Sequence, residues 1–346
     1  MYPEIMKIQE NVLLSGYTTF RTGGPARYFA VVKNISDLKI AVLFAKEKKL
    51  SFFVLGKGAN VLVSDVGFFG LVIKMEIKGM EVKNLLNKKT RVFVGAGEDW
   101  DTFISKTVKR GLVGLENLSL IPSTVGASAV GNIGAYGTEV KDHIFFVEAL
   151  HTETMKVKKF SHKECSFGYR ESFFKTKEGK KYIVVRIAFD LKKKGNLKTD
   201  YKDVQEFFEN GKIISPTQKD VRDAIISIRI KKLPDISSVG TAGSFFKNPV
   251  VSKRKADVLK ETYPNLPIFP SEGKNVKISA AFILDKICGF KGCKKGNVGT
   301  WGSQALVLVN YGGATTKEIL NFAEEMKNKV KEKTGIDLEF EVKMIK

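Results

Sequence analysis

The loop Gly56-Lys57-Gly58-Ala59-Asn60 is the first segment whose residue types could do chemistry. Its small residues leave backbone N–H groups accessible, which would suit a diphosphate, and a tight turn between two strands is the equal alternative. The pair Gly95-x-Gly97 is followed by Trp100 where a third glycine would be needed. A Rossmann site is therefore not supported by the sequence.

The chain from Gly111 to Gly137 shows neither a strong strand period nor a helical period, and its part from Ile121 to Gly137 is rich in glycine, alanine and serine. Small residues let the backbone approach a flat ligand closely, and Ser123, Thr124 and Asn132 could hydrogen-bond to it. A buried glycine-rich crossover would have the same composition. Long irregular stretches in compact chains are usually functional or disordered, and the small apolar residues here argue against disorder. We therefore favour a ligand-binding role.

Two further segments place a polar side chain among aromatic residues. Arg170 lies in Gly168-Tyr-Arg-Glu-Ser-Phe-Phe-Lys175. Arginine suits carboxylates and developing oxyanions, but a structural ion pair, for example with Glu171, is the simpler interpretation. Ser244 lies in Gly243-Ser-Phe-Phe-Lys-Asn-Pro249, with no histidine nearby in sequence and no G-x-S-x-G pattern. A nucleophilic role is therefore not supported, and proton donation or capping are the open interpretations.

The C-terminal region predicts a helix followed by a strand. Thr315-x-x-Glu318 forms a capping box, and Gly335 ends the helical stripe. Apolar and polar residues alternate over 336–344, as in a half-buried strand. An acid on the inward side of this strand could stabilise charge, but the pattern does not choose between the three acids Asp337, Glu339 and Glu341.

The helices and strands that must position these residues alternate along the chain. Helical spacing predicts helices over 36–49 (capped by Ser36-Asp37), 99–110, 217–230, 253–261 and 277–287. Short apolar runs predict strands over 52–55, 61–63, 70–74, 91–94, 182–191 and 305–309. We interpret the lysine-rich stretch 83–89 as a turn or a domain boundary, and 240–251 as a glycine-led turn. The fold class is α+β, with several domains.

Composition excludes several classes of protein. A chain of 346 residues with 43% apolar and 27% charged residues is globular, and we expect two or three domains. It contains no apolar run long enough to span a membrane and no secretory signal, so we expect a cytoplasmic protein. Three cysteines without a CxxC pair, and three histidines without metal spacing, predict neither a disulfide framework nor a metal site.

The net charge of +21 permits nucleic-acid binding, but the lysines are spread along the chain and no nucleic-acid-binding motif occurs. Anionic small ligands suit such a surface better.

Six ordered segments together resemble the UDP-N-acetylenolpyruvoylglucosamine reductases, the flavoenzymes of bacterial peptidoglycan precursor synthesis. Chance does not account for six agreements in order across nearly the whole chain. The segments are Thr19–Ala26, Leu55–Asn60, Ile121–Gly137, Tyr169–Ser172, Ala242–Pro249 and Leu338–Val342.

The resemblance implies a two-part FAD-binding domain of the vanillyl-alcohol-oxidase type and a smaller α+β substrate domain. The implied divisions are residues 1–78, completed by a C-terminal strand in 331–346, then 79–230, then the substrate domain 231–330. It also implies that NADPH reduces FAD, and that the flavin N5 hydride then adds to the β-carbon of the enolpyruvyl ether to give UDP-N-acetylmuramate.

The family's functional residues carry over position by position. Its serine proton donor falls on Ser244, and its charge-stabilising arginine and glutamate fall on Arg170 and Glu341, which chooses the acid that pattern could not. Arg229 stands where the family has a second active-site arginine. With it, the implied cofactor residues are Gly56, Lys57, Gly58, Ala59, Asn60, Ser123, Thr124, Gly126, Ala127, Asn132 and Gly134.

The stretch 199–203 resembles the tyrosine loop of the longer family branch, in which a tyrosine closes over the uridine diphosphate. Phe269 stands where the family often has tyrosine, so one hydroxyl contact is lost. Lys57 and Ala59 replace the commoner glycine and serine, adding a charge and removing a hydroxyl at the diphosphate. The implied substrate residues are Tyr201, Lys232, Asn248, Phe269, Lys277, Lys291 and Gln304.

Two alternatives stay open. Another FAD oxidoreductase of the same fold would keep the glycine segments but need not keep Arg170, Ser244 and Glu341 together. A nucleic-acid-binding protein is motivated by net charge alone. The partners expected here are the small-molecule substrate and NADPH, with no nucleic acid, no membrane and a monomeric chain.

Overall fold

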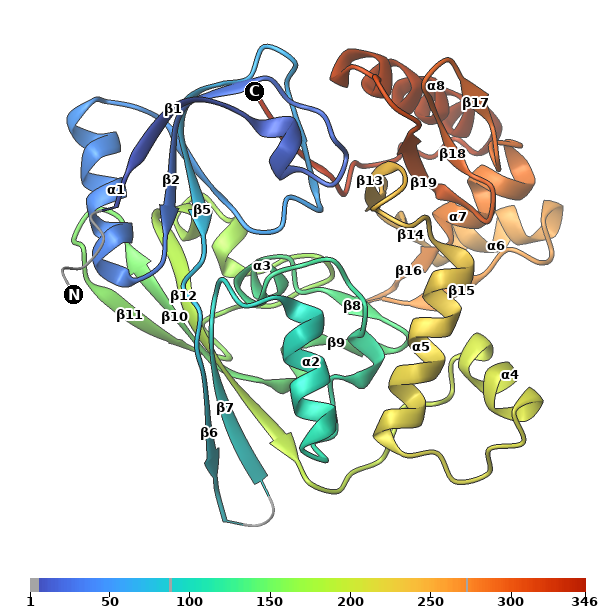
Figure 1. The fold of residues 1–346 in the computed structure, drawn as a ribbon. Coiled ribbons are helices and arrows are strands. Elements are labelled where there is room, and N and C mark those ends of the chain that lie inside the picture. The colour runs from blue at the N-terminus through green and yellow to red at the C-terminus, as the bar shows by residue number, and fades with distance from the viewer. Residues whose placement is uncertain (1–5, 87–88, 272) are drawn as a thin grey trace. The chain divides into compact units, whose positions relative to one another are not determined.

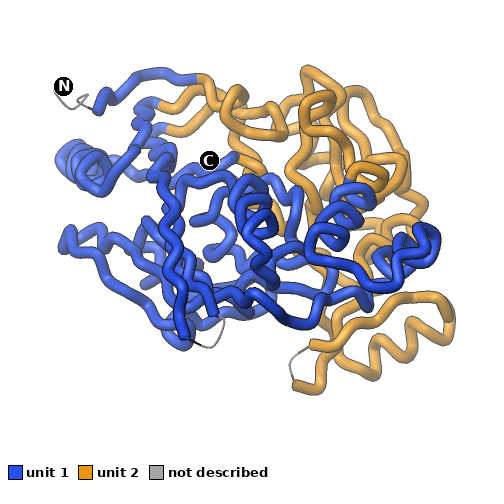
Figure 2. The backbone as a smooth tube through the Cα atoms, turned by 60° about the horizontal axis from the view of Figure 1, so that its bottom comes forward, with its two compact units in different colours: residues 1–12, 27–57, 69–229 blue, residues 13–26, 58–68, 230–346 orange. Residues whose placement is uncertain are grey.

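The computed structural model describes residues 6–86, 89–271 and 273–346 (Figure 1). The chain divides into two compact units, coloured separately in Figure 2. Unit 1 comprises residues 1–12, 27–57 and 69–229, and unit 2 comprises residues 13–26, 58–68 and 230–346. Each unit has its own hydrophobic core. The division falls within the Gly56–Asn60 loop, between Lys57 and Gly58.

The first sheet of unit 1 has the strand order β1-β2-β5-β3. Strands β3 and β5 are parallel, with Leu55 opposite Lys74, so their carboxyl ends meet at one edge of the sheet. The helix α1 (Ile35–Glu47) packs its apolar stripe into the unit 1 core. Its N-cap is Asn34, whose side chain accepts the Asp37 N–H at 2.8 Å, so the expected Ser36-Asp37 cap is wrong by two residues. The strands are β1 (Ile8–Leu13), β2 (Pro25–Val32), β3 (Phe52–Leu55) and β5 (Phe68–Met75).

The second sheet of unit 1 is antiparallel and confirms the strands expected near 91–94 and 182–191. The expected lysine-rich turn is shorter than 83–89, because Lys83 and Lys89 belong to strands; residues 87 and 88 of that stretch lie outside the described residues. In order, the strands are β11 (Val157–Ser161), β10 (Ile144–His151), β12 (Tyr182–Lys192), β7 (Lys89–Gly95) and β6 (Met80–Asn84).

An aromatic cluster closes the core of unit 1 around the helix α2 (Trp100–Lys109), which confirms the helix expected over 99–110. Trp100 and Phe103 are buried, and the Phe103 and Phe189 ring centroids are 5.0 Å apart. The Trp100 Nε1–H donates to the Leu118 carbonyl at 2.9 Å, so the one polar atom of this indole is satisfied in the core. This bond ties α2 to the turn Glu116–Leu118, which precedes the glycine-rich segment.

The glycine-rich segment is more regular than its sequence predicts. It contains the short helix α3 (Val125–Val130) and the hairpin of β8 (Gly134–Ala135) with β9 (Thr138–Glu139). The helix α4 (Lys202–Asn210) was not expected, although its apolar residues pack against the helix α5 (Gln218–Lys232). The helix expected over 217–230 is confirmed as α5, which ends directly before Leu233-Pro234.

Unit 2 is built on two antiparallel sheets (Figure 1). The glycine-led turn expected over 240–251 is wrong: this segment supplies strands to both sheets, with a register shift between Thr241 and Ser244 where Gly243 adopts φ +73°. The first sheet contains β13 (Gly240–Ser244), β19 (Gln304–Asn310), β18 (Val298–Trp301) and β17 (Lys294–Lys295), and the second contains β14 (Val250–Ser252), β16 (Asn275–Ile278) and β15 (Ile268–Pro270).

The helices of unit 2 follow their sequence signals except in one place. The helix α6 (Lys253–Thr262) is confirmed. The helix expected over 277–287 starts too early, because residues up to Ile278 pair in β16. After the cap Ser279, a turn of helix, α7 (Ala280–Phe282), runs into a π-helical turn, η6 (Ile283–Ile287).

At the C-terminus, the predicted capping box is confirmed, whereas the predicted strand is shorter than expected. Thr315 caps α8 (Thr316–Thr334) reciprocally with Glu318, and Gly335 ends the helix with φ +62°. The alternating burial over 336–344 is present, but ladder pairing is confined to β20 (Lys343–Ile345), which runs parallel to β4 (Val61–Val63). Before β20, residues Glu339–Glu341 bond to Phe245, Phe246 and Lys247, which directly follow β13.

Across residues 6–86, 89–271 and 273–346, the structure shows no helix with the length and apolar character to cross a lipid bilayer.

Candidate active site

The turn after β3 is shaped by close packing at Gly56. A Cβ placed there would lie 2.6 Å from the Thr124 Oγ1, and the Ala127 methyl group is 3.6 Å away. A larger residue at position 56 would displace the start of α3. The structure therefore places Gly56, Thr124 and Ala127 together at one edge of unit 1, as a cofactor-binding loop and a ligand-binding segment would require.

Lys57 is joined to the first turn of α2. Its Nζ lies 2.5 Å from the Asp99 Oδ2, while the Asp99 Oδ1 accepts the Thr102 N–H at 2.9 Å as the helix N-cap. Burial would raise the pKa of Asp99, but hydrogen bonds from Lys57 and Thr102 outweigh it, and the pKa is lowered. The charge that Lys57 brings to the loop is thus largely balanced by Asp99.

The rest of this loop belongs to unit 2. Gly58 is buried with φ +72°, its carbonyl accepts the Thr19 N–H at 3.1 Å, and a Cβ there would collide with the Tyr17 carbonyl. Ala59 is half-buried. The Asn60 Nδ2 donates to the Glu341 carbonyl at 3.2 Å. Within unit 2, the loop is therefore held against the C-terminal segment.

Backbone hydrogen bonds fix the start of α3 on the residues that follow β7. The Gly126 N–H donates to the Ala96 carbonyl at 2.8 Å, and the Val125 N–H donates to the Glu98 carbonyl at 2.9 Å. The Ser123 Oγ lies 3.1 Å from the Thr124 carbonyl. The small residues at this position serve close packing of backbone on backbone, and the exposed Ala127 marks the outer side of the helix.

Asn132 is the most completely enclosed polar residue of the site. Its side chain is fully buried and its Nδ2 donates to the Gly168 carbonyl at 2.8 Å. Its Oδ1 accepts the Lys141 N–H at 3.2 Å, and its φ is +40°. Asn132 thus joins the end of α3 to the segment carrying Arg170, which is a structural role in this part of the site.

Arg170 is brought to the same hairpin. Its Nη2 donates to the Gly134 carbonyl at 3.1 Å, and its own carbonyl accepts the Lys175 ammonium at 2.5 Å. Its backbone lies in the left-handed region with φ +57°. Such a backbone conformation in a residue other than glycine is held by its surroundings and is frequent at functional sites. Within unit 1, the structure therefore unites Asn132, Gly134 and Arg170.

Arg229, at the end of unit 1, is a half-buried cation with an unfilled donor. Its Nε–H is buried with no hydrogen-bond partner in the described structure, while its guanidinium bonds to the Tyr136 hydroxyl. Burial lowers the pKa of Arg229, and Tyr136 and Asp101 oppose that shift. A cation with a buried, orphaned donor fits an anionic ligand.

Tyr136 also contacts the loop expected to close over substrate. Its ring meets the ring of Tyr201 edge to face, with centroids 5.2 Å apart. Tyr201 is 42% exposed and stands at the N-cap of α4. Burial raises the pKa of both tyrosines, and the Asp203 charge adds to the effect at Tyr201. Both hydroxyl groups are therefore neutral hydrogen-bonding groups at physiological pH.

Ser244 and Glu341 lie on neighbouring backbone segments of unit 2. The residue after Ser244 is Phe245, whose carbonyl accepts the Glu341 N–H at 2.9 Å. Phe246 and Phe340 form a β-bridge, and their rings pack with Phe245 in the unit 2 core. The buried aromatic side chains thus fix the backbone, and the half-buried Ser244 and Glu341 extend from it.

The structure separates the three C-terminal acids by burial. Glu341 is half-buried, whereas the Asp337 and Glu339 side chains are 71% and 75% exposed. Glu339 pairs with Lys247 at 3.1 Å, and Asp337 pairs with Lys331 at 2.9 Å. Burial therefore favours the same acid that the family resemblance selects.

The expected substrate residues of unit 2 lie on several elements. Around the β14-β16-β15 sheet, Phe269 faces Lys277 across the strands, and the Asn248 Oδ1 accepts the Ala280 N–H at 3.0 Å. Lys291 lies 3.6 Å from Asp285, and Gln304, which opens β19, accepts the Leu306 N–H at 3.3 Å. Lys232 is half-buried at the end of α5.

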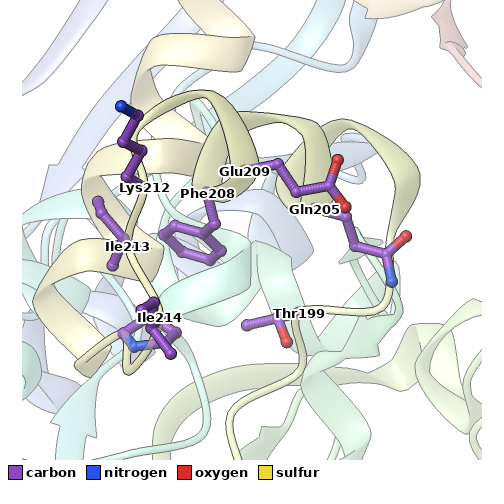
Figure 3. Close-up of a pocket in the computed structure, with 8 residues that line it drawn as sticks. Thr199, Gln205, Phe208, Glu209, Lys212, Ile213 and Ile214 are labelled. Carbon is purple, nitrogen blue, oxygen red and sulfur yellow. The ribbon is translucent and has the colours of Figure 1, made fainter.

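A small cavity of about 390 Å³ lies beside the segment that carries Tyr201, in unit 1 (Figure 3). Its lining mixes polar and apolar side chains, and Ile214 at its rim is 94% exposed. None of the residues expected from the sequence to bind cofactor or substrate lines it. Figure 3 shows Phe208 between the polar Gln205 and Thr199 and the apolar Ile213.

Two residues that contact the proposed site residues were not identified from the sequence. Tyr136, the partner of Arg229, could have been found as the one aromatic residue in an otherwise small-residue stretch. Lys74 donates to the Gly56 carbonyl at 2.5 Å. Its signal is a lysine inside the apolar run of β5, where a charged side chain needs a specific partner.

Comparisons with known proteins agree with this geometry. A model of an FAD-binding domain matches residues 26–158, so the chain is an FAD-binding flavoprotein. The buried Arg229 donor and the close-packed turn at Gly56 fit that cofactor. A model of the UDP-N-acetylenolpyruvoylglucosamine reductase C-terminal domain matches residues 235–345.

Full-length relatives define the family. The UDP-N-acetylenolpyruvoylglucosamine reductase of Flavobacterium johnsoniae is 39% identical over 98% of this chain and 100% of its own length. That of Pseudomonas aeruginosa is 39% identical over 96% and 98%. The crystal structure of the Thermus caldophilus reductase matches with a TM-score of 0.69 and 26% identity, covering 99% of this chain and 100% of that one. The chain belongs to the UDP-N-acetylenolpyruvoylglucosamine reductase family.

The family resemblance, the α+β fold and the FAD cofactor expected from the sequence are thereby confirmed. The individual site residues, the tyrosine-loop branch and the three domain divisions stay predictions.

Proposed function

We propose that the protein reduces UDP-N-acetylglucosamine enolpyruvate to UDP-N-acetylmuramate, using NADPH as the reductant and FAD as the carrier. The observation that carries this proposal is the placement of Ser244 beside Glu341 in a chain that matches the reductases over 98% of its length. Another FAD oxidoreductase would have no reason to keep both residues on adjoining backbone segments.

Unit 1 supplies most of the residues that would hold FAD. Gly56 and Lys57 form one side of the turn, and Ser123, Thr124 and Ala127 belong to the facing α3 segment. Arg229 offers a half-buried cation with a buried Nε–H. FAD has an anionic diphosphate, which a cation with an unfilled N–H donor and accessible backbone amides can bind. Bound FAD would supply the hydride for the β-carbon of the enolpyruvyl group.

Ser244 and Glu341 would take part in the second half-reaction, in which the reduced flavin reduces the enolpyruvyl group. Hydride addition to the β-carbon drives negative charge toward the substrate carboxylate, and a proton must then reach the α-carbon. The Ser244 hydroxyl would donate that proton. A serine hydroxyl is a weak acid, so Lys247, three residues further on, or a bound water would replace its proton. Glu341 would polarise the enol system from the adjoining segment.

Arg170 would stabilise the charge that develops on the substrate carboxylate. Its guanidinium is held by the Gly134 carbonyl and its backbone is fixed by Lys175. A preorganised cation stabilises charge without having to reorganise during the reaction, which is how such groups lower a barrier.

The nucleotide sugar would be bound by Lys232, Asn248, Lys277, Lys291 and Gln304. By the family resemblance, Tyr201 would contact its diphosphate. Phe269 faces Lys277 in the second sheet of unit 2. A phenylalanine there supplies ring contact without a hydroxyl group. We also propose the three divisions 1–78 with 331–346, 79–230 and 231–330, a monomeric chain and a cytoplasmic location.

The test is product analysis in the steady state. The purified protein, reconstituted with FAD, is mixed with NADPH and UDP-N-acetylglucosamine enolpyruvate, and the products are measured by mass spectrometry. One UDP-N-acetylmuramate, two hydrogen atoms heavier than the substrate, should form for each NADPH oxidised. NADPH oxidation that consumes no enolpyruvate would contradict the proposal.

A further inference from the structure

Lys74 places a charged group against the backbone of the turn at Gly56. It stands in β5 directly opposite Leu55 of β3, one residue before that turn. Its Nζ donates to the Gly56 carbonyl at 2.5 Å, and the side chain is half-buried. The residues Leu71, Val72, Ile73 and Met75 around it in the strand are all buried apolar residues. A lysine at this position is costly unless its ammonium group has a defined partner.

The hydrogen bond fixes the orientation of one peptide plane. In a trans peptide, the carbonyl of Gly56 and the N–H of Lys57 belong to the same plane and point in opposite directions. No cis peptide bond occurs in the residues that the structure describes. With the carbonyl turned to Lys74, the Lys57 N–H is therefore turned away from it. Flipping this plane would require breaking a charge-assisted hydrogen bond.

The local charges make Lys74 the less neutralised of two neighbouring cations. Lys57 is paired with Asp99 at 2.5 Å. Burial lowers the pKa of Lys74; Glu76 opposes the shift, and Lys57 and Lys78 add to it. The ammonium group of Lys74 is thus partly desolvated beside a turn of backbone amides. Such a cation favours the arrival of an anion.

We infer that Lys74 is a positioning residue for FAD: its ammonium group holds the Gly56 carbonyl and so presents the Lys57 N–H to the cofactor diphosphate. This rests on the proposed function, because it takes FAD as the ligand of the turn. It adds a residue from inside a strand to a cofactor site otherwise made of loop and helix residues. The side chain acts through the backbone of the turn.

The test compares single variants of the full chain by the dissociation constant for FAD, measured from flavin fluorescence after removal of the bound cofactor. Lys74→Met removes the donor and the charge while keeping side-chain length, and Lys74→Arg keeps both. Lys78→Met is the matched control, because it removes the same charge from an exposed lysine four residues further on. Circular dichroism checks that each variant is folded.

Lys74→Met should weaken FAD binding about 10- to 100-fold, and Lys74→Arg should recover most of that loss, whereas Lys78→Met should change affinity less than about threefold. If Lys74→Met does not fold, Lys74→Gln, which keeps a donor but no charge, should weaken binding severalfold. Affinity within twofold of wild type in Lys74→Met or its Gln substitute, or an equal loss in Lys78→Met, overturns the inference. A wild-type chain that takes up no FAD would instead refute the proposed function.

Discussion

The cofactor-type residues of unit 1 and the reaction-type residues of unit 2 are held in different ways. In unit 1, side chains such as Asn132, Arg170 and Lys74 donate to backbone carbonyls of neighbouring segments. In unit 2, main-chain bonds and buried phenylalanine rings hold the backbone, and Ser244 and Glu341 extend from it. In unit 1, side chains of the proposed site also hold the fold together, whereas around Ser244 and Glu341 of unit 2 backbone bonds join the neighbouring segments.

The largest effect expected from this difference is in Ser244→Ala. The rate at which substrate reoxidises the reduced flavin should fall about 10²- to 10⁴-fold, because the proton donor is lost. Flavin reduction by NADPH and the urea midpoint should stay at wild-type values, since the backbone bonds around residue 244 do not use its side chain. Stopped-flow absorbance measures both half-reactions.

The exposed Ser303→Ala is the matched control for that variant. Reoxidation by Ser244→Ala at the rate of Ser303→Ala would remove Ser244 from the mechanism.

Asn132→Ala should show the opposite behaviour and lower the free energy of unfolding by about 3 kcal/mol. The substitution removes the side-chain hydrogen bonds to the Gly168 carbonyl and the Lys141 N–H and places alanine at φ +40°. Urea denaturation of the FAD-free protein measures the loss. Asn210→Ala, at the exposed end of α4, should change stability by less than about 0.5 kcal/mol. Equal stability of the two variants would contradict the structural role of Asn132.

Glu341→Gln should lower turnover about tenfold or more while leaving stability almost unchanged, because the charge that polarises the substrate is removed but the backbone bonds remain. Glu339→Gln is the control on the same segment, and its side chain is 75% exposed. Steady-state NADPH oxidation with saturating substrate measures both. If the two substitutions reduce turnover alike, the choice of Glu341 among the three acids is wrong.

The smallest effect concerns pH and the Asp101–Arg222 pair of unit 1, whose closest atoms are 2.7 Å apart. Burial would raise the pKa of Asp101, but hydrogen bonds from Arg222 and the Leu120 N–H outweigh it and lower the pKa below 3.8. The carboxylate therefore stabilises the fold fully above pH 5, and this contribution disappears as pH falls through 3.8 toward the folded-state pKa. Asp101→Asn should lose about 1 kcal/mol at pH 7 and show a shallower acid limb in urea titrations. A wild-type acid limb in this variant would contradict the assignment.

Capping and helix-breaking residues predicted the helix ends that depend on interactions between neighbours in sequence. The capping box at Thr315 and the breaker at Leu233-Pro234 correctly bounded two helices. The segments 240–251 and 277–278 were misassigned, because their strands exist only through pairing with distant residues such as Val307 and Val250. Such pairing leaves little trace in a single segment of sequence.

The residue types in the sequence predicted that a ligand binds, but they did not predict the contacts between side chains that are distant in sequence. Glycine-rich segments indicated a ligand, but Lys74 and Tyr136 act through contacts that only the fold creates. Asp337, Glu339 and Glu341 alternate identically in sequence, and burial separates them in the structure. The family resemblance supplied the roles that periodicity did not.

One measurement tests the central claim most directly: an anaerobic visible spectrum of the FAD-loaded protein, before and after NADPH, and again after UDP-N-acetylglucosamine enolpyruvate. The flavin absorbance should bleach with NADPH and return on addition of the substrate, which resolves the two half-reactions in one sample. Bleaching without recovery would contradict the assignment of the substrate and of Ser244 and Glu341, while leaving the flavin-binding role of unit 1 in place.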